Sequence, residues 1–286
     1  MIKVILVPVD GTERSAEVLD TALVVAQRFD AHIKVVHVRE SSREPFMFSG
    51  MPASYRAEYA KMSNRAVDSV ADEVRKQFNA FCTAGKIKIT RKPSVAQEIT
   101  ASLHILEGDA ETVLDRESRL VDVIAMSRPT KSHIGGHGVG ELHESLMLHS
   151  GRPVLIVPPT EEWKAHRANH AAIGWNDSVE ASRALCMTLP WLTQMKKVSV
   201  LVSKKREQGV GEVVDYLKRH GCKADYQVLA GKGTNVGKKM LGTCADIGAE
   251  FLVVGGFSHT RTRQRLFGGV TSYLLKNTNI ITVMAH

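Results

Sequence analysis

Residue types that bind anions gather between Gly255 and Thr271. Two glycine pairs enclose three arginines and a histidine there. Glycine lets the backbone approach a ligand, arginine binds phosphate through two N–H groups, and the free N–H groups of a helix start attract negative charge. The segment therefore predicts a phosphate or related anion site, and the alternative is a surface loop whose arginines contact only water. The candidate residues are Gly255, Gly256, Ser258, His259, Arg261, Arg263, Gly268, Gly269 and Val270, with Arg265 as a further donor.

A second glycine-rich segment spans residues 127–140. Its glycines between Gly135 and Gly140 could form a concave anion-binding turn. Pro129 removes a backbone donor early in this segment. We therefore interpret it as a connection between elements, and we expect the anion site in the second half of the chain.

Two polar residues follow strand-like runs near the start of each half. Asp10 could accept hydrogen bonds from a ribose hydroxyl or an adenine amine, whereas Asn176 can both donate and accept. Asp10 could equally form a local turn before Gly11. Thr12 and Ser178 are suitable N-cap residues for the helices that follow.

An internal repeat places these segments at matching points of two α/β units. Each unit contains short runs rich in Val and Ile, typical of strands buried on both faces, and amphipathic helices separate them. A long helix over residues 55–81 is also predicted, whereas no structure is assigned to residues 86–94. The expected strands are 2–9, 32–38, 101–107, 121–127 and 153–157 in the first half, and 170–175, 197–203, 222–229, 251–255 and 280–284 in the second.

Alternation of strand and helix predicts an α/β fold with two tandem, doubly wound, five-stranded parallel-sheet domains. We expect one domain over residues 1–158 and a second over 169–286, with a proline-rich linker at 158–164 between them. Ligands bind such sheets where the winding reverses, here between the first and fourth strands. A tandem of this kind should have pseudo-two-fold symmetry.

Together, the V-P-V-D-G opening and the glycine-bearing segment ending in G-G-V-T resemble the universal stress protein family, as two family domains over nearly the whole chain. ATP-binding members carry a glycine, two residues, a second glycine, nine residues, and then Gly-Ser or Gly-Thr. Gly255 and Gly268 match this motif, whereas Ser258 and Gly269 replace its other two positions. The first half has no match to it. The resemblance implies the Rossmann-like strand order 3-2-1-4-5. It places Asp10 and Asn176 beside adenosine, and Val38 and Val202 as backbone contacts to adenine.

Composition restricts the partners. The net charge is +8, but the basic residues are spread along the chain and aromatics make up only 6%, so no nucleic-acid surface is expected. No run approaches the length of a membrane span, and four scattered cysteines fit a reducing compartment, so we expect a cytoplasmic protein. Histidines at 133, 137, 143 and 149 are a poor metal frame, and the H-I-G-G-H run is interpreted as accidental.

These features predict a cytoplasmic universal-stress-type protein that binds ATP, AMP or another adenine nucleotide as a regulatory module, at one site per chain in the second half. No metal is expected beyond a nucleotide-associated Mg²⁺. A homodimer of tandem chains fits the family resemblance. One alternative is a nucleotide-independent interaction or chaperone-like protein. Another is a slow ATP-hydrolysing enzyme, although no catalytic base or Walker lysine motif is evident.

Overall fold

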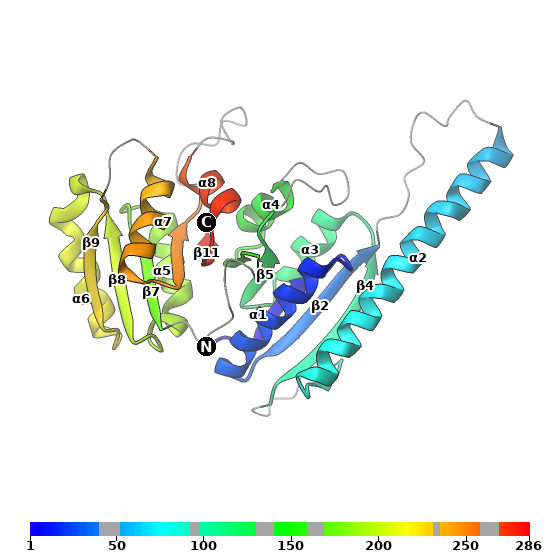
Figure 1. Cartoon of the computed structure of the whole chain (residues 1–286), viewed down its shortest axis with the longest axis horizontal. Helices are drawn as coiled ribbons and strands as arrows, with labels where there is room; N and C mark the ends of the chain where they lie inside the picture. The colour runs from blue at the N-terminus through cyan, green and yellow to red at the C-terminus, as the bar shows by residue number, and fades with distance from the viewer. Residues whose placement is uncertain (40–51, 92–97, 130–139, 160–168, 231–234, 258–268) are drawn as a thin grey trace.

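The computed structural model describes the chain except for residues 40–51, 92–97, 130–139, 160–168, 231–234 and 258–268. Strands and helices alternate along both halves (Figure 1). In the first half the elements are β1 (Val4–Pro8), α1 (Glu13–Phe29), β2 (His32–Arg39), α2 (Ala53–Ala84), β3 (Lys88–Ile89), β4 (Thr100–Glu107), α3 (Ala110–Ser118), β5 (Val123–Ser127), α4 (Glu141–His149) and β6 (Val154–Val157). In the second half they are β7 (His170–Gly174), α5 (Val179–Leu192), β8 (Lys197–Val202), the 3₁₀ helix η2 (Lys204–Gly209), α6 (Val210–Arg219), β9 (Ala224–Val228), α7 (Val236–Ile247), β10 (Phe251–Gly255), α8 (Val270–Asn277) and β11 (Ile281–Ala285).

The eleven strands of the described residues form one sheet, in the order β3-β4-β2-β1-β5-β6-β11-β10-β7-β8-β9. Apart from the short β3, each half therefore has the order 3-2-1-4-5 that the family resemblance implied. The α/β fold with parallel pairing inside each half is confirmed, and all ten predicted strands lie within two residues of the observed ones. Because both halves share one sheet, the division into domains at 158 and 169 remains a prediction.

The halves meet through β6 and β11, which pair antiparallel. Arg128 N–H donates to the Val157 carbonyl at 2.7 Å, and Gly256 N–H donates to the Ala285 carbonyl at the same distance, so Val157 and Ala285 are equivalent. Counting back two residues makes Leu155 equivalent to Val283, and these two residues face each other across the junction. The expected pseudo-two-fold axis therefore passes between this pair, perpendicular to the sheet.

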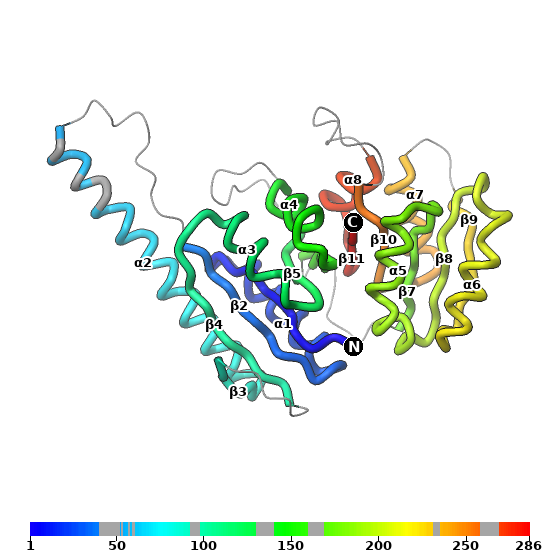
Figure 2. The backbone as a smooth tube through the Cα atoms, turned by 180° about the vertical axis from the view of Figure 1, so that it is seen from behind, coloured from blue at the N-terminus to red at the C-terminus, as the bar shows by residue number. Residues whose placement is uncertain are grey.

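Hydrophobic side chains cover the sheet on both faces, and each core runs across the junction. Helices α1, α2, α5 and α6 contribute to the core on one face. Helices α3, α4, α7 and α8 contribute to the core on the other. Viewed from behind, α4 and α8 lie next to each other at the junction, as they do from the front (Figures 1 and 2). The halves are thus joined by buried apolar surface as well as by backbone pairing, and burial of apolar surface is the dominant stabilising contribution.

An aromatic cluster strengthens the junction on the first face. Trp191 of α5 is only 2% exposed. Its ring packs edge-on against Phe29 at the end of α1, with centroids 6.0 Å apart, and in a tilted arrangement against Phe251 of β10, with centroids 5.7 Å apart. Trp191 therefore links a helix of the first half to the sheet of the second.

A buried histidine makes the fold sensitive to acid. His32 is hydrogen-bonded through Nδ1 to Thr100 Oγ1 at 2.8 Å and through Nε2 to Ser102 Oγ at 2.9 Å. Burial, with smaller effects from His104 and Lys34, lowers the pKa of His32 from 6.5 to about 4. The folded state thus holds fewer protons than the unfolded chain between these pH values. The stability contributed by neutral His32 is present above about pH 6.5 and is lost as the pH falls towards 4.

We expect the protein to lose about 2 kcal/mol of stability through His32 alone between about pH 7.5 and pH 5. His32→Gln should be less stable than the parent at pH 7.5 but should lose less on acidification. Urea unfolding at a series of pH values measures both slopes. The matched control is His220→Gln at an exposed histidine, which should keep the parental slope. Equal slopes for the parent and His32→Gln would contradict the assignment.

Candidate functional site

The winding of each half reverses between its first and fourth strands, as predicted. In the second half β7 pairs with β10 on one side and β8 on the other. In the first half β1 lies between β5 and β2. The carboxyl ends of β7 and β10 therefore lie at the switch point, the edge where open α/β sheets bind ligands, which we call the crevice. Gly255 ends β10 at this crevice, and Asn176 follows β7.

Gly255 is required by packing. A Cβ atom at this position would lie 2.5 Å from the backbone nitrogen of Ala181 and 2.6 Å from the carbonyl carbon of Glu180. Both atoms belong to the first turn of α5, so a side chain could be admitted only by moving that helix. The glycine predicted to approach a ligand thus allows β10 and α5 to approach each other.

Hydrogen bonds hold the two ends of the candidate anion segment together. Gly256 N–H donates to the Ala285 carbonyl at 2.7 Å, and the Gly256 carbonyl accepts from His286 Nδ1 at 3.1 Å. Phe257, whose φ of 57° is in the left-handed region, donates its N–H to Thr271 Oγ1 at 3.1 Å. Residue 257 is therefore tied to the first turn of α8. Thr271 is a site residue that the sequence interpretation did not single out.

Helix α8 starts at this same edge. Gly269 is its N-cap, its carbonyl accepts from Tyr273 N–H at 3.1 Å, and Val270 is the first helical residue. The N–H groups of a first helical turn have no carbonyl partner within their own helix, so they favour an anion. Ser258, His259, Arg261, Arg263 and Gly268 lie outside the described residues, as does Arg265.

Asn176 shapes the turn into α5. Its Oδ1 accepts from Ser178 N–H at 3.3 Å, and Ser178 Oγ accepts from Ala181 N–H at 3.2 Å. The predicted cap at Ser178 is confirmed by this bond. Asp177 adopts a φ of 59°, and its carboxylate lies 3.7 Å from Arg206 of η2. Asn176 thus lies at the crevice, in a turn that its own side chain helps to hold.

The hydrogen-bond register distinguishes Val202 from Val38. Successive carbonyls of a strand point to opposite neighbours. The Val36 carbonyl accepts from Val9 of the first strand, so Val38, two residues on, faces the same side. In the second half the Leu201 carbonyl accepts from Trp175, whereas the Val202 carbonyl accepts from Leu229 beside β9.

The backbone of Val202 is therefore directed away from the crevice. Ser203 occupies the position equivalent to Val38. The sequence interpretation missed Ser203 because two similar hydrophobic strands can be aligned one residue apart, and only the strand ladder fixes their register.

Asp10 in the first half is held by its own turn. Its Oδ1 accepts from the N–H of Thr12 at 3.0 Å and from the hydroxyls of Thr12 and Ser15, each at 2.7 Å. Thr12 is the N-cap of α1, but its hydroxyl is directed to Asp10 and does not cap the helix. This geometry supports the alternative that Asp10 forms a local turn.

Helix α2 lies directly over that turn. Gln77 Nε2 donates to the Gly11 carbonyl at 2.8 Å. A Cβ on Gly11 would touch Val70 and Val74, each at 3.4 Å. The Asp10–Gly11 turn is thus covered by a helix for which the second half, within its described residues, has no equivalent of similar length.

The residues at the carboxyl end of β5, the fourth main strand of the first half, make contacts that stabilise the fold. The Arg128 guanidinium donates to the Thr278 carbonyl at the end of α8, at 2.7 Å. His143 Nε2 donates to the Ser127 carbonyl at 2.7 Å. Burial lowers the pKa of His143 below its usual value, although the bond to Ser127 opposes this shift. These side chains join α4 and α8 to the sheet.

Among the described residues, no group of three or more His, Cys, Asp or Glu side chains is arranged to hold a metal ion. No helix in the described ranges combines the length and hydropathy that a bilayer crossing requires. The histidines at 133 and 137 lie outside these ranges.

Comparison with known proteins gives a consistent result. The model of the universal stress protein family matches residues 1–158. No curated protein matches the chain. In fold, the chain is similar to a universal stress protein from Archaeoglobus fulgidus DSM 4304, with a TM-score of 0.68, 15% identity, and 99% of this chain and 97% of that chain covered.

Two Pseudomonas aeruginosa proteins are also similar in fold. A putative universal stress protein from strain UCBPP-PA14 has a TM-score of 0.56 and 12% identity, covering 99% of this chain and 93% of that chain. A functionally unknown protein from strain PAO1 has the same TM-score and identity, with 99% and 92% covered. At these identities the likeness concerns the fold alone.

Proposed function

Because the chain belongs to the universal stress protein family, we propose that it is a regulatory protein that binds one adenine nucleotide, in the crevice between β7 and β10. The observation that carries this proposal is the hydrogen bond from Phe257 to Thr271, which holds the two ends of the 258–268 segment together beside the start of α8, at the switch point of the sheet. This arrangement suits the phosphate end of a nucleotide.

The described residues fit such a ligand in a specific way. The backbone groups of Gly256 are already bonded to Ala285 and His286, so the phosphate donors must come from elsewhere. The first turn of α8 and the arginines of the 258–268 segment are the donors we assign to the phosphates. At the other end, the amide of Asn176 and the backbone of Ser203 are the groups we assign to the nucleoside.

The first half is proposed as a built-in structural partner. Its Asp10 carboxylate serves its own turn, α2 covers Gly11, and Arg128 and His143 hold helices in place. It thus takes the position that a second subunit would occupy in a family homodimer. We therefore expect one nucleotide per chain, bound by a soluble protein of the cytoplasm.

The proposal is tested by titrating ATP and AMP into the parent and into Arg261→Ala, Arg263→Ala and Gly268→Val. Loss of one charge-assisted contact should remove about 1.5–3 kcal/mol, which weakens binding by roughly tenfold or more. Gly268→Val should be at least as harmful, because a β-branched side chain would block close approach of the backbone to the phosphates. Calorimetry gives the affinity and stoichiometry, and the melting temperature without ligand monitors folding.

The matched control is Lys131→Ala in the corresponding segment of the first half, which should bind as the parent does. Two equal sites per chain would contradict the asymmetry. If the parent binds neither nucleotide, or if all three second-half variants bind as the parent does while folded, the nucleotide proposal fails. The protein would then be better described as a nucleotide-independent interaction module.

A further inference from the structure

Helix α2 extends well beyond the body of the protein (Figures 1 and 2). Its second half packs firmly, with Ala71, Val74 and Phe78 buried. Towards its start, the ion pair between Asp68 and Arg39 joins it to the body. Residues 54–67, which we call the arm, precede this contact. None of the arm side chains that the structure describes is buried.

The arm exposes an apolar stripe. Tyr55 is 65% exposed and Met62 is 64% exposed, and Ala66 is exposed as well. The spacings of seven and four residues place all three on one side of a helix. Val70, still 40% exposed, continues the stripe to the point where α2 packs on Gly11. An apolar stripe of this kind on an exposed helix indicates a surface that packs against another helix.

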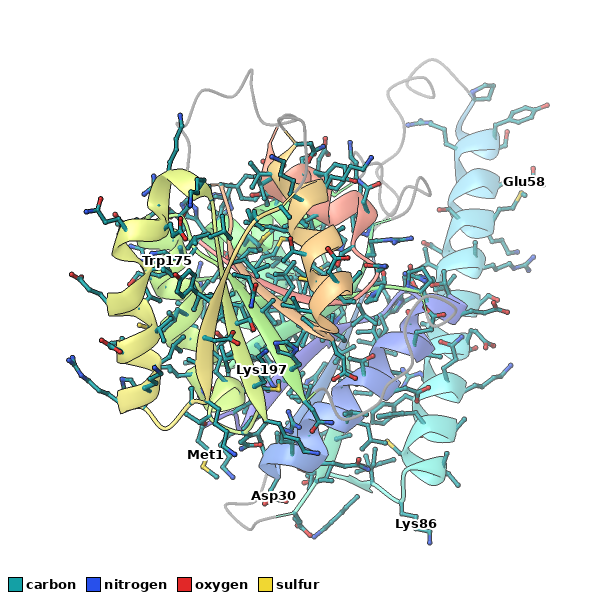
Figure 3. All side chains as sticks on the ribbon, turned by 60° about the vertical axis from the view of Figure 1, so that its left-hand side comes forward. Met1, Asp30, Glu58, Lys86, Trp175 and Lys197 are labelled. Carbon is teal, nitrogen blue, oxygen red and sulfur yellow. The ribbon has the colours of Figure 1, made fainter. Side chains whose placement is uncertain are left out.

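A lone arm should also be only marginally helical. Its 14 residues span about 21 Å, and helices of this length gain most of their stability from packing an amphipathic face. Figure 3 shows the exposed position of the arm, with Glu58 on it and Lys86 just beyond the opposite end of α2. A partner that covers the stripe would therefore stabilise the arm as well as bind it.

Two charged residues beside the stripe indicate that its partner is a second, antiparallel arm. Glu58 and Arg65 are both exposed and lie on the same flank of the stripe, four residues before and three residues after Met62. Met62 is also near the middle of the arm. A second arm that runs antiparallel, centred on Met62, would place Glu58 of each chain opposite Arg65 of the other. In a parallel pair the two equivalent flanks would lie on opposite sides of the contact, so Glu58 and Arg65 would not face each other.

We propose that the arms of two chains pair antiparallel about Met62, so that the protein forms an arm-to-arm dimer. With this centre each arm is covered along its full length, and its first residues, 54–56, lie opposite residues 68–70 of the partner, where α2 begins to contact the body. The contact buries less surface area than a standard protein interface, so the dimer is weak and forms at high protein concentration.

Disulfide cross-linking tests the proposal directly. The background is the full chain with Cys186→Ser, which removes the exposed cysteine and leaves the buried Cys82, Cys222 and Cys244. Met62→Cys should give a covalent dimer under mild oxidation. Tyr55→Cys should not, because two residues 55 would lie about 21 Å apart in the antiparallel pair. Asn64→Cys, exposed on the opposite side of the arm, is the matched control and should also stay monomeric.

A charge swap gives a second, independent measurement. In sedimentation equilibrium, Glu58→Arg and Arg65→Glu should each weaken dimerisation by about fivefold, and the double swap should restore it. Melting temperatures should stay at the parental value because the arm is outside the core. The proposal is overturned by efficient cross-linking at position 55 or 64, by a monomeric parent whose Met62→Cys variant also fails to cross-link, or by a double swap as weak as the single ones.

Discussion

Trp191→Ala should destabilise the protein by about 3–5 kcal/mol, the usual effect of removing a large buried aromatic side chain. Trp191 is 2% exposed and contacts Phe29 of the first half and Phe251 of the second. Its loss leaves a cavity in the core that runs across the junction. Thermal and urea unfolding, followed by circular dichroism, measure the change.

Trp191→Phe is the matched control, because it keeps a ring at the junction and should recover much of the lost stability. We also expect the parent to unfold in one transition, since both cores and the sheet are continuous between the halves. An alanine variant as stable as the parent, or a parent that melts in two separate transitions, would show that the junction contributes little.

Gly255→Val should destabilise the fold by about 3 kcal/mol, even if no ligand binds there. The new Cβ would collide with backbone atoms of Ala181 and Glu180, and backbone cannot move aside as a flexible side chain can. The first turn of α5 must therefore shift away from β10. The readout is the free energy of unfolding without any nucleotide.

The neighbouring glycine is the control. A Cβ at Gly256 would have its nearest neighbour, Met147 Sδ, at 3.6 Å, which is ordinary contact. Gly256→Ala should therefore stay within about 0.5 kcal/mol of the parent. Equal effects at the two positions would refute the packing role of Gly255. A loss of nucleotide affinity in a fully stable Gly255→Val would return this glycine to the ligand site.

The strands and the duplicated topology follow from the sequence because each signal is local. Runs such as Val4–Pro8 and Phe251–Gly255 are apolar on nearly every residue, and this pattern marks a strand buried on both faces wherever it occurs. The repeat then fixes the order of elements. The short strand at Lys88–Ile89 lacks this signal, since both residues are exposed, and it was not predicted.

The roles of individual site residues depend on contacts between distant segments. A glycine that admits a ligand and a glycine that admits a helix look identical in sequence, and only the approach of α5 identifies Gly255 as the second kind. Likewise, Ser203 and Val202 differ only in which neighbouring strand their backbone faces.

The sequence by itself therefore determined the α/β class, the ten main strands and the two switch points, because hydrophobic periodicity and turn chemistry act over a few residues. The family followed from the resemblance of its glycine-bearing motifs. Only the tertiary structure decided that the halves join through β6 and β11 into one sheet, that α2 covers the Asp10–Gly11 turn, and that the arm projects from the body. These features depend on which segments pack together across the whole chain. A local sequence pattern does not identify the distant segment against which it packs.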